Sequence, residues 1–383
     1  MTHATFRGDA ASCPPFPAAP DPAVLRLRVV HRAVAELRRG TPVLLDGAAP
    51  LAVLAAETAG ARGLGEFAAL AAGAPLLLLA PARAAAVLRR PVGQDVAPVA
   101  LPVARALLDP ARLRSLADPT ADDLLPAEPP APVAPPPAGA AALALAKLAR
   151  LLPAVLAASA SGHAAEPLGL LRVPGADVLE YPDAIAARLA RVAEAEVPLA
   201  DAPDARMVAF RGPDAGIEHL AILVGRPERV AAPLARIHSE CFTGDLLGSL
   251  RCDCGAQLRG AIRRIAAEGA GVLLYLAQEG RGIGLANKLR AYVLQDAGLD
   301  TVDANRALGW GADERRFLIA ATMLRELGIA HVRLLTNNPD KVAALAACGI
   351  TVVREPHAFA PNGINDRYLA TKAARFGHLL DKA

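Results

Sequence analysis

The sequence predicts an α/β protein with a mixed-sheet domain in its C-terminal half, preceded by a smaller α+β domain. Its length of 383 residues favours two hydrophobic cores over one. The C-terminal half alternates short apolar segments with amphipathic ones, which is the pattern of strands connected by helices. Nine of the 13 aromatic residues follow residue 191, so the core with the larger side chains is expected there.

Changes in composition place the expected domain boundaries. We expect a disordered tail at residues 1–22, a first domain at 23–190 and a second domain at 191–383. Seven of the 33 prolines fall in residues 126–137, within the first domain. Such a run favours an extended conformation and cannot join a helix or a central strand, so it predicts a linker or a long exposed loop.

The first domain shows the weaker patterning of the two. An amphipathic helix is expected at residues 24–39, followed by a turn and a strand at 42–45. Another apolar element is expected at 74–79. Helices are expected at 141–158 and at 182–195, and the second of these should lead into the next domain.

The second domain has a regular alternation of elements. The expected order is a strand at 271–276, helices at 285–297 and 313–327, a strand at 331–335, a helix at 339–348 and a strand at 350–354. Strands joined by helices imply a mixed or parallel sheet, whose loops at the strand ends form the usual ligand site. Functional side chains are therefore expected in these loops.

The composition argues against several classes of protein. With 41 basic and 38 acidic residues the formal net charge is +3, so neither nucleic acid nor a membrane surface is expected as a partner, although a small anion is compatible with it. Five cysteines at uneven spacing argue against a disulfide framework and for a metal site in a reducing compartment, so we expect a cytoplasmic protein. The apolar runs are short and interrupted by proline or arginine, so none is expected to span a membrane.

The strongest local signal is a group of three cysteines. Cys241, Cys252 and Cys254 lie in the run SECFTGDLLGSLRCDCGAQL with C-x10-C-x-C spacing. Thiolates are soft ligands that suit zinc, and three protein ligands leave the fourth position open to water, as in a catalytic zinc site. Two alternatives fit the same pattern: a structural site closed by His238, or three unrelated cysteines in a core.

A second group of residues suits a phosphate. Arg236 and Glu240 flank the first cysteine, Glu279 and Arg281 lie in the run QEGRGIG, and Lys341 begins a helix after TNNPD. The glycines let backbone amides approach an anion, and arginine offers a forked pair of donors. On pattern alone, however, a glycine-rich turn is more often a plain connection, and these charges are compatible with a solvated surface. Only their convergence on one set of loops would make a phosphate site.

An acid–base candidate lies in the run GWGADERRF. Asp313 and Arg315 stand at the start of an expected helix, where a carboxylate commonly caps the helix or interacts with its dipole. Tyr292 is, by pattern, a half-buried packing residue whose hydroxyl needs one partner. Periodicity alone gives none of the three a catalytic role.

Taken together, these motifs resemble the GTP cyclohydrolase II family across the second domain. The matching runs, in the order of the family, are RIHSECFTGDLLGSLRCDCGAQL, LAQEGRGIGLANKLRAYVLQDAGLDTVDAN, GWGADERRF, LLTNNPDK and GHLL. The resemblance implies one catalytic zinc ion per subunit, held by Cys241, Cys252 and Cys254. An α/β fold with a mixed sheet is what the family implies as well.

The same resemblance assigns roles to the other candidates. Asp313 would be the proton acceptor, Arg315 the nucleophile, and Tyr292 the active-site tyrosine beside the zinc. Contacts with GTP are implied at Arg236, Ile237, His238, Ser239, Glu240, Gln257, Glu279, Gly280, Arg281, Thr301, Thr336 and Lys341.

The implied reaction is the first step of riboflavin synthesis. Arg315, assisted by Asp313 and Mg²⁺, would attack the α-phosphate of GTP and release pyrophosphate. Zinc would activate the water that opens the imidazole ring, whose C8 leaves as formate. The product would be 2,5-diamino-6-(5-phosphoribosylamino)pyrimidin-4(3H)-one. The family also implies a homodimer.

Two other functions fit the same residues. The chain could be a noncatalytic, zinc-stabilised nucleotide-binding regulatory protein, or a paralogue that acts on another purine nucleotide. A protein that only binds nucleotide has no chemical reason to keep Asp313, Arg315 and Tyr292 together. Only a substrate assay separates the second alternative from GTP hydrolysis.

The first domain resembles 3,4-dihydroxy-2-butanone 4-phosphate synthase, in runs such as AVAELRRGTPVLLDG and PGADVLEYPDAIAARLARVAEAEVP. That family requires a dense acidic run for a divalent metal after its first strand, whereas the run LLDGAAPLAVLAAE has only Asp46 and Glu57. We therefore expect a degenerate, inactive domain that serves folding, dimer contact or regulation.

Overall fold

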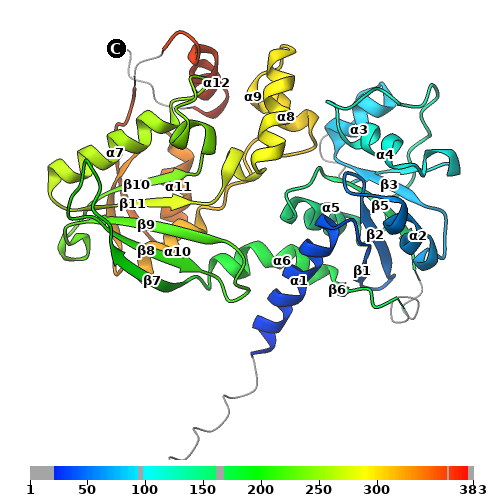
Figure 1. The fold of residues 1–383 in the computed structure, drawn as a ribbon, viewed down its shortest axis with the longest axis horizontal. Helices are drawn as coiled ribbons and strands as arrows, with labels where there is room; N and C mark the ends of the chain where they lie inside the picture. Colours follow the sequence, from blue (N-terminus) through cyan, green and yellow to red (C-terminus); the bar gives the residue numbers. More distant parts are fainter. Residues whose placement is uncertain (1–20, 94–97, 161–167, 360–361, 378–383) are drawn as a thin grey trace, which may run out of the picture.

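The computed structural model describes residues 21–93, 98–160, 168–359 and 362–377 (Figure 1). It contains two β-sheets, one in each half of the chain, and helices pack against both. Most of the expected disordered tail, residues 1–20, lies outside the described residues.

The first sheet belongs to the N-terminal half and is mostly antiparallel. Only the pair of strands β1 and β6 is parallel. The spatial order is β4 (Val99–Pro102), β3 (Leu76–Leu79), β5 (Ala154–Ser159), β2 (Leu51–Ala55), β1 (Val43–Asp46) and β6 (Arg172–Pro174). The expected strand at 42–45 and the apolar element at 74–79 are thus both confirmed, with small shifts of their bounds.

Helices cover both faces of this sheet. In β3, Leu77 and Leu79 face one apolar core and Leu78 faces the other, as the alternation of side chains along a strand requires. The first core is closed by α2 (Ala61–Leu70), α3 (Pro81–Leu88) and α4 (Pro110–Ala117), and the second by α1 (Pro22–Arg38), α5 (Gly139–Leu148) and α6 (Gly175–Ala186). The central strands β2, β3 and β5 are buried on both sides, so their sequences are nearly continuous apolar runs, whereas the edge strand β6 has exposed ends.

The second sheet is mixed, as the sequence predicts. Its order is β13 (Thr351–Glu355), β12 (His331–Leu335), β10 (Leu234–Ser239), β11 (Gly271–Leu276), β9 (Glu218–Val224), β8 (Arg206–Arg211) and β7 (Ala190–Glu196). The four strands from β10 to β13 pair in parallel, and the pairs that join β7, β8, β9 and β11 are antiparallel. The parallel part therefore brings several carboxyl ends of strands to one edge.

Helix α7 (Cys254–Glu268) packs on one face of the second sheet and α10 (Leu318–Glu326) on the other. Helix α11 (Pro339–Ala347) packs beside α10, and α12 (Asp366–Phe376) lies near the C-terminus. Figure 1 shows α8 (Leu285–Asp296) and α9 (Thr301–Ala307) extending from this sheet toward the first half.

These two helices share a hydrophobic core with the first half of the chain. Ile283, Ala291, Ala304, Leu308 and Trp310 belong to the same apolar cluster as the strands of the first sheet. The segment 283–310 is therefore held between two sheets. This placement bears on the functional site, because α8 and α9 carry some of its residues.

Two expected helices are wrong in their second parts. The helix expected at 141–158 ends at residue 148, the chain turns at Arg150 with a φ of 57°, and residues 154–159 form the buried strand β5. The helix expected at 182–195 begins earlier and ends at residue 186, and residues 190–196 form the edge strand β7. Alanine-rich sequence favours helix, but pairing with neighbouring strands outweighs that preference in both places.

The helix expected at 313–327 begins later than predicted. Residues 318–326 form α10, and the segment before it is an irregular loop. Asp313 therefore does not cap this helix, so the default interpretation of that carboxylate from pattern alone is wrong. The loop turns back toward the glycine-rich segment, where the amide of Glu314 donates to Arg281 O, so its residues are not part of the helix.

The proline-rich run lies on the surface of the N-terminal half. Residues 126–137 contain no regular helix, and their one ladder contact is an isolated bridge between Val133 and Ala100. The run leads into α5 and lies between elements of the first sheet, so it does not connect the two sheets. Among the described residues, no helix combines the length and hydrophobicity needed to cross a bilayer.

His219 at the start of β9 makes stability depend on pH. Burial lowers the pKa of this histidine to about 4, and its Nδ1 accepts a hydrogen bond from Ala277 N at 3.1 Å. In the unfolded chain the pKa of histidine is higher, about 6.5. As the pH falls from about 6.5 toward 4, His219 therefore takes up a proton in the unfolded chain but not in the folded one, and the free energy of unfolding decreases. We expect the free energy of unfolding to fall by about 2 kcal/mol between pH 7.5 and pH 5 through this residue.

Urea unfolding at the two pH values checks this expectation. In His219→Gln the amide oxygen can still accept the hydrogen bond but does not titrate, so the dependence on pH should weaken by that amount. The matched control is His331→Gln, at an exposed position. An unchanged pH dependence in His219→Gln would contradict the prediction.

Candidate active site

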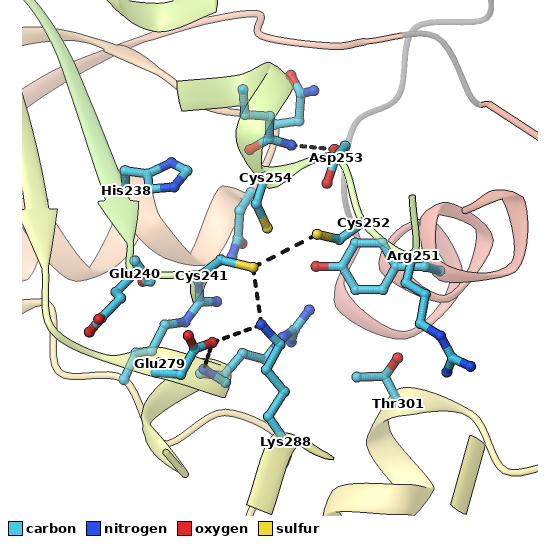
Figure 2. Close-up of a pocket in the computed structure, with 18 of the residues that line it drawn as sticks. His238, Glu240, Cys241, Arg251, Cys252, Asp253, Cys254, Glu279, Lys288 and Thr301 are labelled. Atoms are coloured by element: carbon cyan, nitrogen blue, oxygen red, sulfur yellow. Dashed lines mark hydrogen bonds and ion pairs between the residues drawn. The ribbon is translucent and has the colours of Figure 1, made fainter. Parts of the chain in front are cut away.

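The candidate active site is a pocket at the carboxyl ends of β10, β11 and β12. Parallel strands that end at one edge collect their loops there, which is where ligands bind in open α/β sheets. Sixteen of the 18 predicted site residues line this pocket (Figure 2): Arg236, His238, Ser239, Glu240, Cys241, Cys252, Cys254, Gln257, Glu279, Gly280, Arg281, Tyr292, Thr301, Arg315, Thr336 and Lys341. The phosphate and metal candidates therefore converge on one set of loops.

Two predicted residues do not line the pocket. The side chain of Ile237 lies in the hydrophobic core, because neighbouring residues of a strand face opposite sides of the sheet. Its carbonyl oxygen still contributes by accepting a hydrogen bond from Lys341 Nζ at 3.0 Å. Asp313 is not among the lining residues, but it accepts a hydrogen bond from Arg315 Nε, which belongs to a lining residue, at 2.8 Å.

The three predicted cysteines form a compact cluster. Their sulfur atoms lie within 4.8 Å of one another, and the Sγ atoms of Cys241 and Cys252 are 3.8 Å apart. Hydrogen bonds with Cys252 and Cys254 hold the pKa of the Cys241 thiol well below its usual range, and the contact with Cys241 raises the pKa of Cys252 to about 11. Sulfurs this close compete for protons, so a soft divalent cation that binds thiolates fits the cluster.

Glycine allows the chain to close around these sulfurs. Gly244 lies in the short helical segment η3 (Phe242–Leu246), and a Cβ at this position would lie 2.7 Å from Cys252 Sγ and 3.0 Å from Cys241 Sγ. A Cβ at Gly255 would lie 2.3 Å from the carbonyl oxygen of Gly244. Any larger residue must therefore displace the sulfurs or the backbone that carries them.

Gly244→Ala is expected to lower zinc affinity by about tenfold or more, because it moves the sulfurs from their common centre. Competition with a chromophoric chelator measures this affinity. The matched control is Gly65→Ala on α2, where a Cβ meets nothing within 4 Å. A zinc affinity equal to that of the parent would contradict this prediction.

His238 does not complete the cysteine cluster. Its Nε2 lies 3.0 Å from the carboxylate of Asp245, which also accepts hydrogen bonds from Tyr275 Oη at 3.0 Å and from Cys241 N at 2.9 Å. Burial lowers the pKa of His238, so the ring is neutral near pH 7. Within the described chain, the group that could hold a metal consists of the three cysteines, which disfavours both alternatives: a site closed by histidine and three unrelated cysteines.

Lys288 on α8 is a site residue that sequence reasoning missed. Its Nζ donates to Cys241 Sγ at 3.1 Å, to Thr243 Oγ1 at 3.0 Å and to Glu279 Oε1 at 2.8 Å (Figure 2). The other oxygen of Glu279 accepts a hydrogen bond from Phe242 N at 2.6 Å. A cation beside the sulfurs stabilises their thiolate forms. The sequence around Lys288 does not indicate this role, because its partners lie in loops that are distant along the chain.

Several buried polar atoms in the pocket have no partner among the described residues. These are Arg236 Nε, His238 Nδ1 and Ser239 Oγ. Arg236 is anchored by a bond from Nη1 to Leu335 O at 2.7 Å and by a bond to Gln257, and its burial lowers its pKa to about 10. Buried polar groups are seldom left unpaired, so these atoms point to a polar ligand.

The glycine-rich segment has an unusual backbone. Gly280 and Arg281 both have positive φ angles, 62° and 63°. For arginine this conformation is unfavourable and persists only where the surroundings impose it. A Cβ at Gly282 would lie 3.1 Å from the backbone of Glu314, whose amide donates to Arg281 O at 3.1 Å. The close approach of the two loops therefore fixes Arg281 in the pocket.

Asp313 and Arg315 form a forked ion pair. Arg315 Nε donates to Asp313 Oδ1 at 2.8 Å, Nη2 bonds to Oδ2, and the amide of Arg315 donates to Oδ1 at 3.1 Å. Burial opposes ionisation of this carboxyl, but hydrogen bonds from Arg315 hold the pKa of Asp313 below its usual range. The guanidinium also stacks over Phe317, with its carbon 5.4 Å from the ring centre. The carboxyl of Asp313 is therefore ionised at neutral pH and oriented by Arg315.

Tyr292 lies beside the cysteine cluster between two cations. Arg251 lies 5.0 Å and Lys288 5.8 Å from the ring centre. Burial raises the pKa of the Tyr292 hydroxyl, which therefore keeps its proton at neutral pH. Figure 2 shows Thr301, the first residue of α9, on the same side of the pocket as Arg251.

The sequence also matches known proteins along most of its length. A GTP cyclohydrolase-2 of Azospirillum brasilense is 49% identical over 383 aligned residues, which cover 95% of this chain and 98% of that protein. The GTP cyclohydrolase II family model matches residues 190–356. This chain belongs to the GTP cyclohydrolase II family.

Relatives of different lengths carry the same name. A GTP cyclohydrolase-2 of Xylella fastidiosa is 41% identical and covers 92% of this chain and 87% of that protein. The GTP cyclohydrolase-2 of Yersinia pseudotuberculosis is 55% identical over 196 residues, which cover all of that protein but 51% of this chain. The GTP cyclohydrolase II family therefore includes members about half as long as this one.

Solved structures do not test the resemblance predicted for the N-terminal half. A two-domain 3,4-dihydroxy-2-butanone 4-phosphate synthase from A. baumannii covers 86% of this chain at 18% identity, with a TM-score of 0.33. This TM-score is too low to show that the two chains share a fold. The resemblance of the first half to that synthase therefore stays a prediction.

Proposed function

We propose that this chain hydrolyses GTP to 2,5-diamino-6-(5-phosphoribosylamino)pyrimidin-4(3H)-one, with release of formate and pyrophosphate. The observation that carries the proposal is the meeting, in one pocket, of three clustered thiols and a forked pair of Asp313 and Arg315. The relatives that match the chain are named GTP cyclohydrolase-2. A protein that only bound nucleotide would need neither feature.

Zinc is the metal that the donor set fits best. Cys241, Cys252 and Cys254 would hold it, and it would supply a Lewis acid for the activation of water. Thiolate ligands select zinc over Mg²⁺, and the Cβ-free cradle at Gly244 leaves room for the sulfurs to approach one another. Around this cluster, Tyr292 keeps its proton and can donate a hydrogen bond to the purine ring.

Cations at the pocket suit the triphosphate. Arg281, Arg315 and Lys341 line the pocket, and each is mostly buried. Cations whose charge is shielded from water attract phosphate oxygens strongly. The backbone at Gly280, with its positive φ, lets an anion approach the main chain closely.

Arg315 is the proposed nucleophile and Asp313 its proton acceptor. A guanidinium carries no lone pair that can attack, so it must lose a proton before a bond to phosphorus forms. The ionised carboxylate of Asp313 lies against Nε and Nη2 and can accept that proton. A nitrogen–phosphorus bond then forms at the α-phosphate and the bond to the pyrophosphate oxygen breaks. Water later cleaves the nitrogen–phosphorus bond and regenerates Arg315.

Mg²⁺ is proposed to enter with the nucleotide. In the part of the chain that the structure describes, no carboxylate group of three or more forms a site for a hard cation. Mg²⁺ commonly binds through substrate phosphates and waters with few protein ligands. The ion would neutralise the leaving pyrophosphate, so activity should require it.

A homodimer and a cytoplasmic location are also proposed. Support for the dimer comes from exposed apolar side chains on two segments that meet at Lys288, namely Leu246 and Leu247 after the first cysteine and Val293 on α8. Apolar side chains that gather on a surface commonly mark an interface. Analytical ultracentrifugation tests this, and a monomer at micromolar concentration would exclude it. Support for the cytoplasm comes from four cysteines that are free in the described residues.

The N-terminal half is proposed to be inactive as a butanone phosphate synthase. Its two candidate metal ligands are already engaged: Asp46 with Arg172 at 2.9 Å, and Glu57 with Arg290 at 2.8 Å and with Leu152 N at 2.7 Å. Both oxygens of Glu57 are engaged at a mostly buried position, and Asp46 is paired with an arginine at the surface, so the two carboxylates do not form a common site for a divalent cation. Formation of the butanone phosphate from ribulose 5-phosphate by the purified protein would overturn this proposal.

The decisive experiment incubates the zinc-loaded protein with GTP and Mg²⁺ and follows formate and pyrophosphate. Equal amounts of both products are expected, together with the absorbance change of ring opening. No formate from GTP would reject the proposed function. Parallel incubation with ATP, ITP and XTP separates a GTP enzyme from a paralogue, since a paralogue would release more formate from one of these.

A further inference from the structure

The N-terminal half contacts the candidate active site through several of its segments. These include the end of α5, with Lys147 and Arg150, Glu57, which follows β2, and Asp118, which follows α4. Each segment bonds to a part of the second half that carries pocket residues. These contacts do not depend on the activity of the synthase family that the sequence of the first half resembles.

Arg150 holds both ends of the segment 277–284. Its Nη2 donates to Ala277 O at 2.8 Å, directly after β11. Its side chain also lies against Gly284, where a Cβ would be 3.1 Å from Arg150 Cδ. Between these points lies Arg281, the pocket residue with the unfavourable φ of 63°. Contacts at both ends restrain a segment that local preference would relax.

Lys147 holds the loop that carries Arg315. Its Nζ donates to Glu314 Oε1 at 2.6 Å, and the same oxygen accepts a hydrogen bond from Gly311 N at 2.7 Å. The amide of Glu314 in turn donates to Arg281 O at 3.1 Å. Because Glu314 directly precedes Arg315, this ion pair fixes the backbone from which the proposed nucleophile extends.

Glu57 and Asp118 hold helix α8 from the first half. Arg290 Nη2 donates to Glu57 Oε1 at 2.8 Å, and its Nε lies 2.8 Å from Asp118 Oδ2. The second oxygen of Glu57 is occupied by Leu152 N. The Arg290 side chain is 21% exposed and those of Glu57 and Asp118 are 15% and 7% exposed, so water screens these bonds little. On the same helix, Lys288 reaches the cysteine cluster.

We propose that the N-terminal half is a brace for the GTP site, with Lys147, Arg150 and Glu57 as positioning residues. The kinetic side of this proposal rests on the proposed hydrolysis of GTP. The brace sets the distances between the glycine-rich segment, the loop of Arg315 and α8, and it takes no part in the chemistry. A displacement of about 1 Å in such groups commonly lowers the rate by about 100-fold.

A charge exchange between Lys147 and Glu314 tests the brace in the full-length, zinc-loaded protein. Lys147→Glu and Glu314→Lys each place like charges together, and the double variant restores an ion pair. Arg62→Glu is the matched control, because it reverses a cation whose partner Glu66, at 3.8 Å, also belongs to the first half. For every variant, kcat, KM, zinc content, melting temperature and amide exchange at residues 279–284 and 311–316 are measured.

Each single reversal is expected to lower kcat by about tenfold or more and to speed amide exchange at 311–316, with zinc content equal to that of Arg62→Glu. The double variant should regain the part of both losses that is due to the ion pair, although Lys at position 314 cannot accept the hydrogen bond from Gly311 N. Single variants that keep the parent kcat and exchange would overturn the brace, and so would a double variant that is no better than the singles. If a reversal unfolds the chain, the milder Lys147→Met replaces it, and the faster exchange is still expected.

The outcomes also separate this proposal from the proposed function. A parent protein that releases no formate from GTP would reject the function, whereas amide exchange needs no substrate and would still decide whether the brace exists. A parent that releases formate, combined with unchanged exchange in Lys147→Met, would reject the brace alone.

Discussion

Arg315→Ala is expected to lower pyrophosphate release from GTP by about 10⁴-fold or more, because it removes the group that attacks the α-phosphate. Formate release should fall with it if phosphorus chemistry comes first in the reaction. Arg315→Lys keeps a positive charge but loses the forked pairing with Asp313, so it should recover little activity. Rapid-quench measurement of pyrophosphate under saturating GTP gives the rate.

Arg263→Ala is the matched control for this variant. Arg263 lies on α7 outside the pocket, and its exposed side chain pairs with Asp201 at 3.5 Å. Its removal should leave kcat within about twofold of the parent, because exposed ion pairs contribute little. If Arg315→Ala released pyrophosphate at the rate of the parent, another group, or water itself, would have to attack the phosphate.

Cys252→Ser is expected to abolish formate release, because a hydroxyl is a poor replacement for a thiolate zinc ligand and two cysteines hold the metal weakly. The zinc content of the purified protein should fall well below one ion per chain. Pyrophosphate release should survive in part, since Asp313 and Arg315 do not contact the cysteine cluster. The predicted signature is thus a loss of one product without an equal loss of the other.

Cys348→Ser is the matched control for the cysteine variant. Cys348 is a free cysteine after α11 that packs beside the hydrophobic core of the second half and lies outside the cluster. Its replacement should change neither zinc content nor formate release. Normal formate release by zinc-free Cys252→Ser would show that ring opening does not depend on the cluster. Dialysis against a chelator should reproduce the effect of Cys252→Ser in the parent, and zinc should reverse it.

Two of the errors in the predicted fold share one physical cause. Residues 154–159 and 190–196 are rich in alanine, so local preference favoured helix, yet they form strands β5 and β7. The strand β5 lies in the middle of the first sheet, where pairing on both sides decides the conformation. Neighbours in space make that choice, and a pattern read along the chain does not contain them.

The sequence alone predicted which residues belong to the site. The spacing of Cys241, Cys252 and Cys254 indicated a metal site and left its type open, the family resemblance favoured catalytic zinc, and the structure brings the three sulfurs within 4.8 Å of one another. The run QEGRGIG allowed a close approach of the backbone to an anion, although its pattern alone favoured a plain connection. These are short-range features whose meaning depends on residue types and small separations, so they are legible without a structure.

Tertiary structure alone decided which residues surround that chemistry. Lys288 reaches Cys241 across 47 positions of sequence, and Lys147 reaches Glu314 across 167. Asp313 changed from a presumed helix cap into the partner of Arg315 because the helix starts later than its pattern suggests. Contacts between distant segments depend on how two sheets and their helices pack, and packing is a property of the folded chain as a whole.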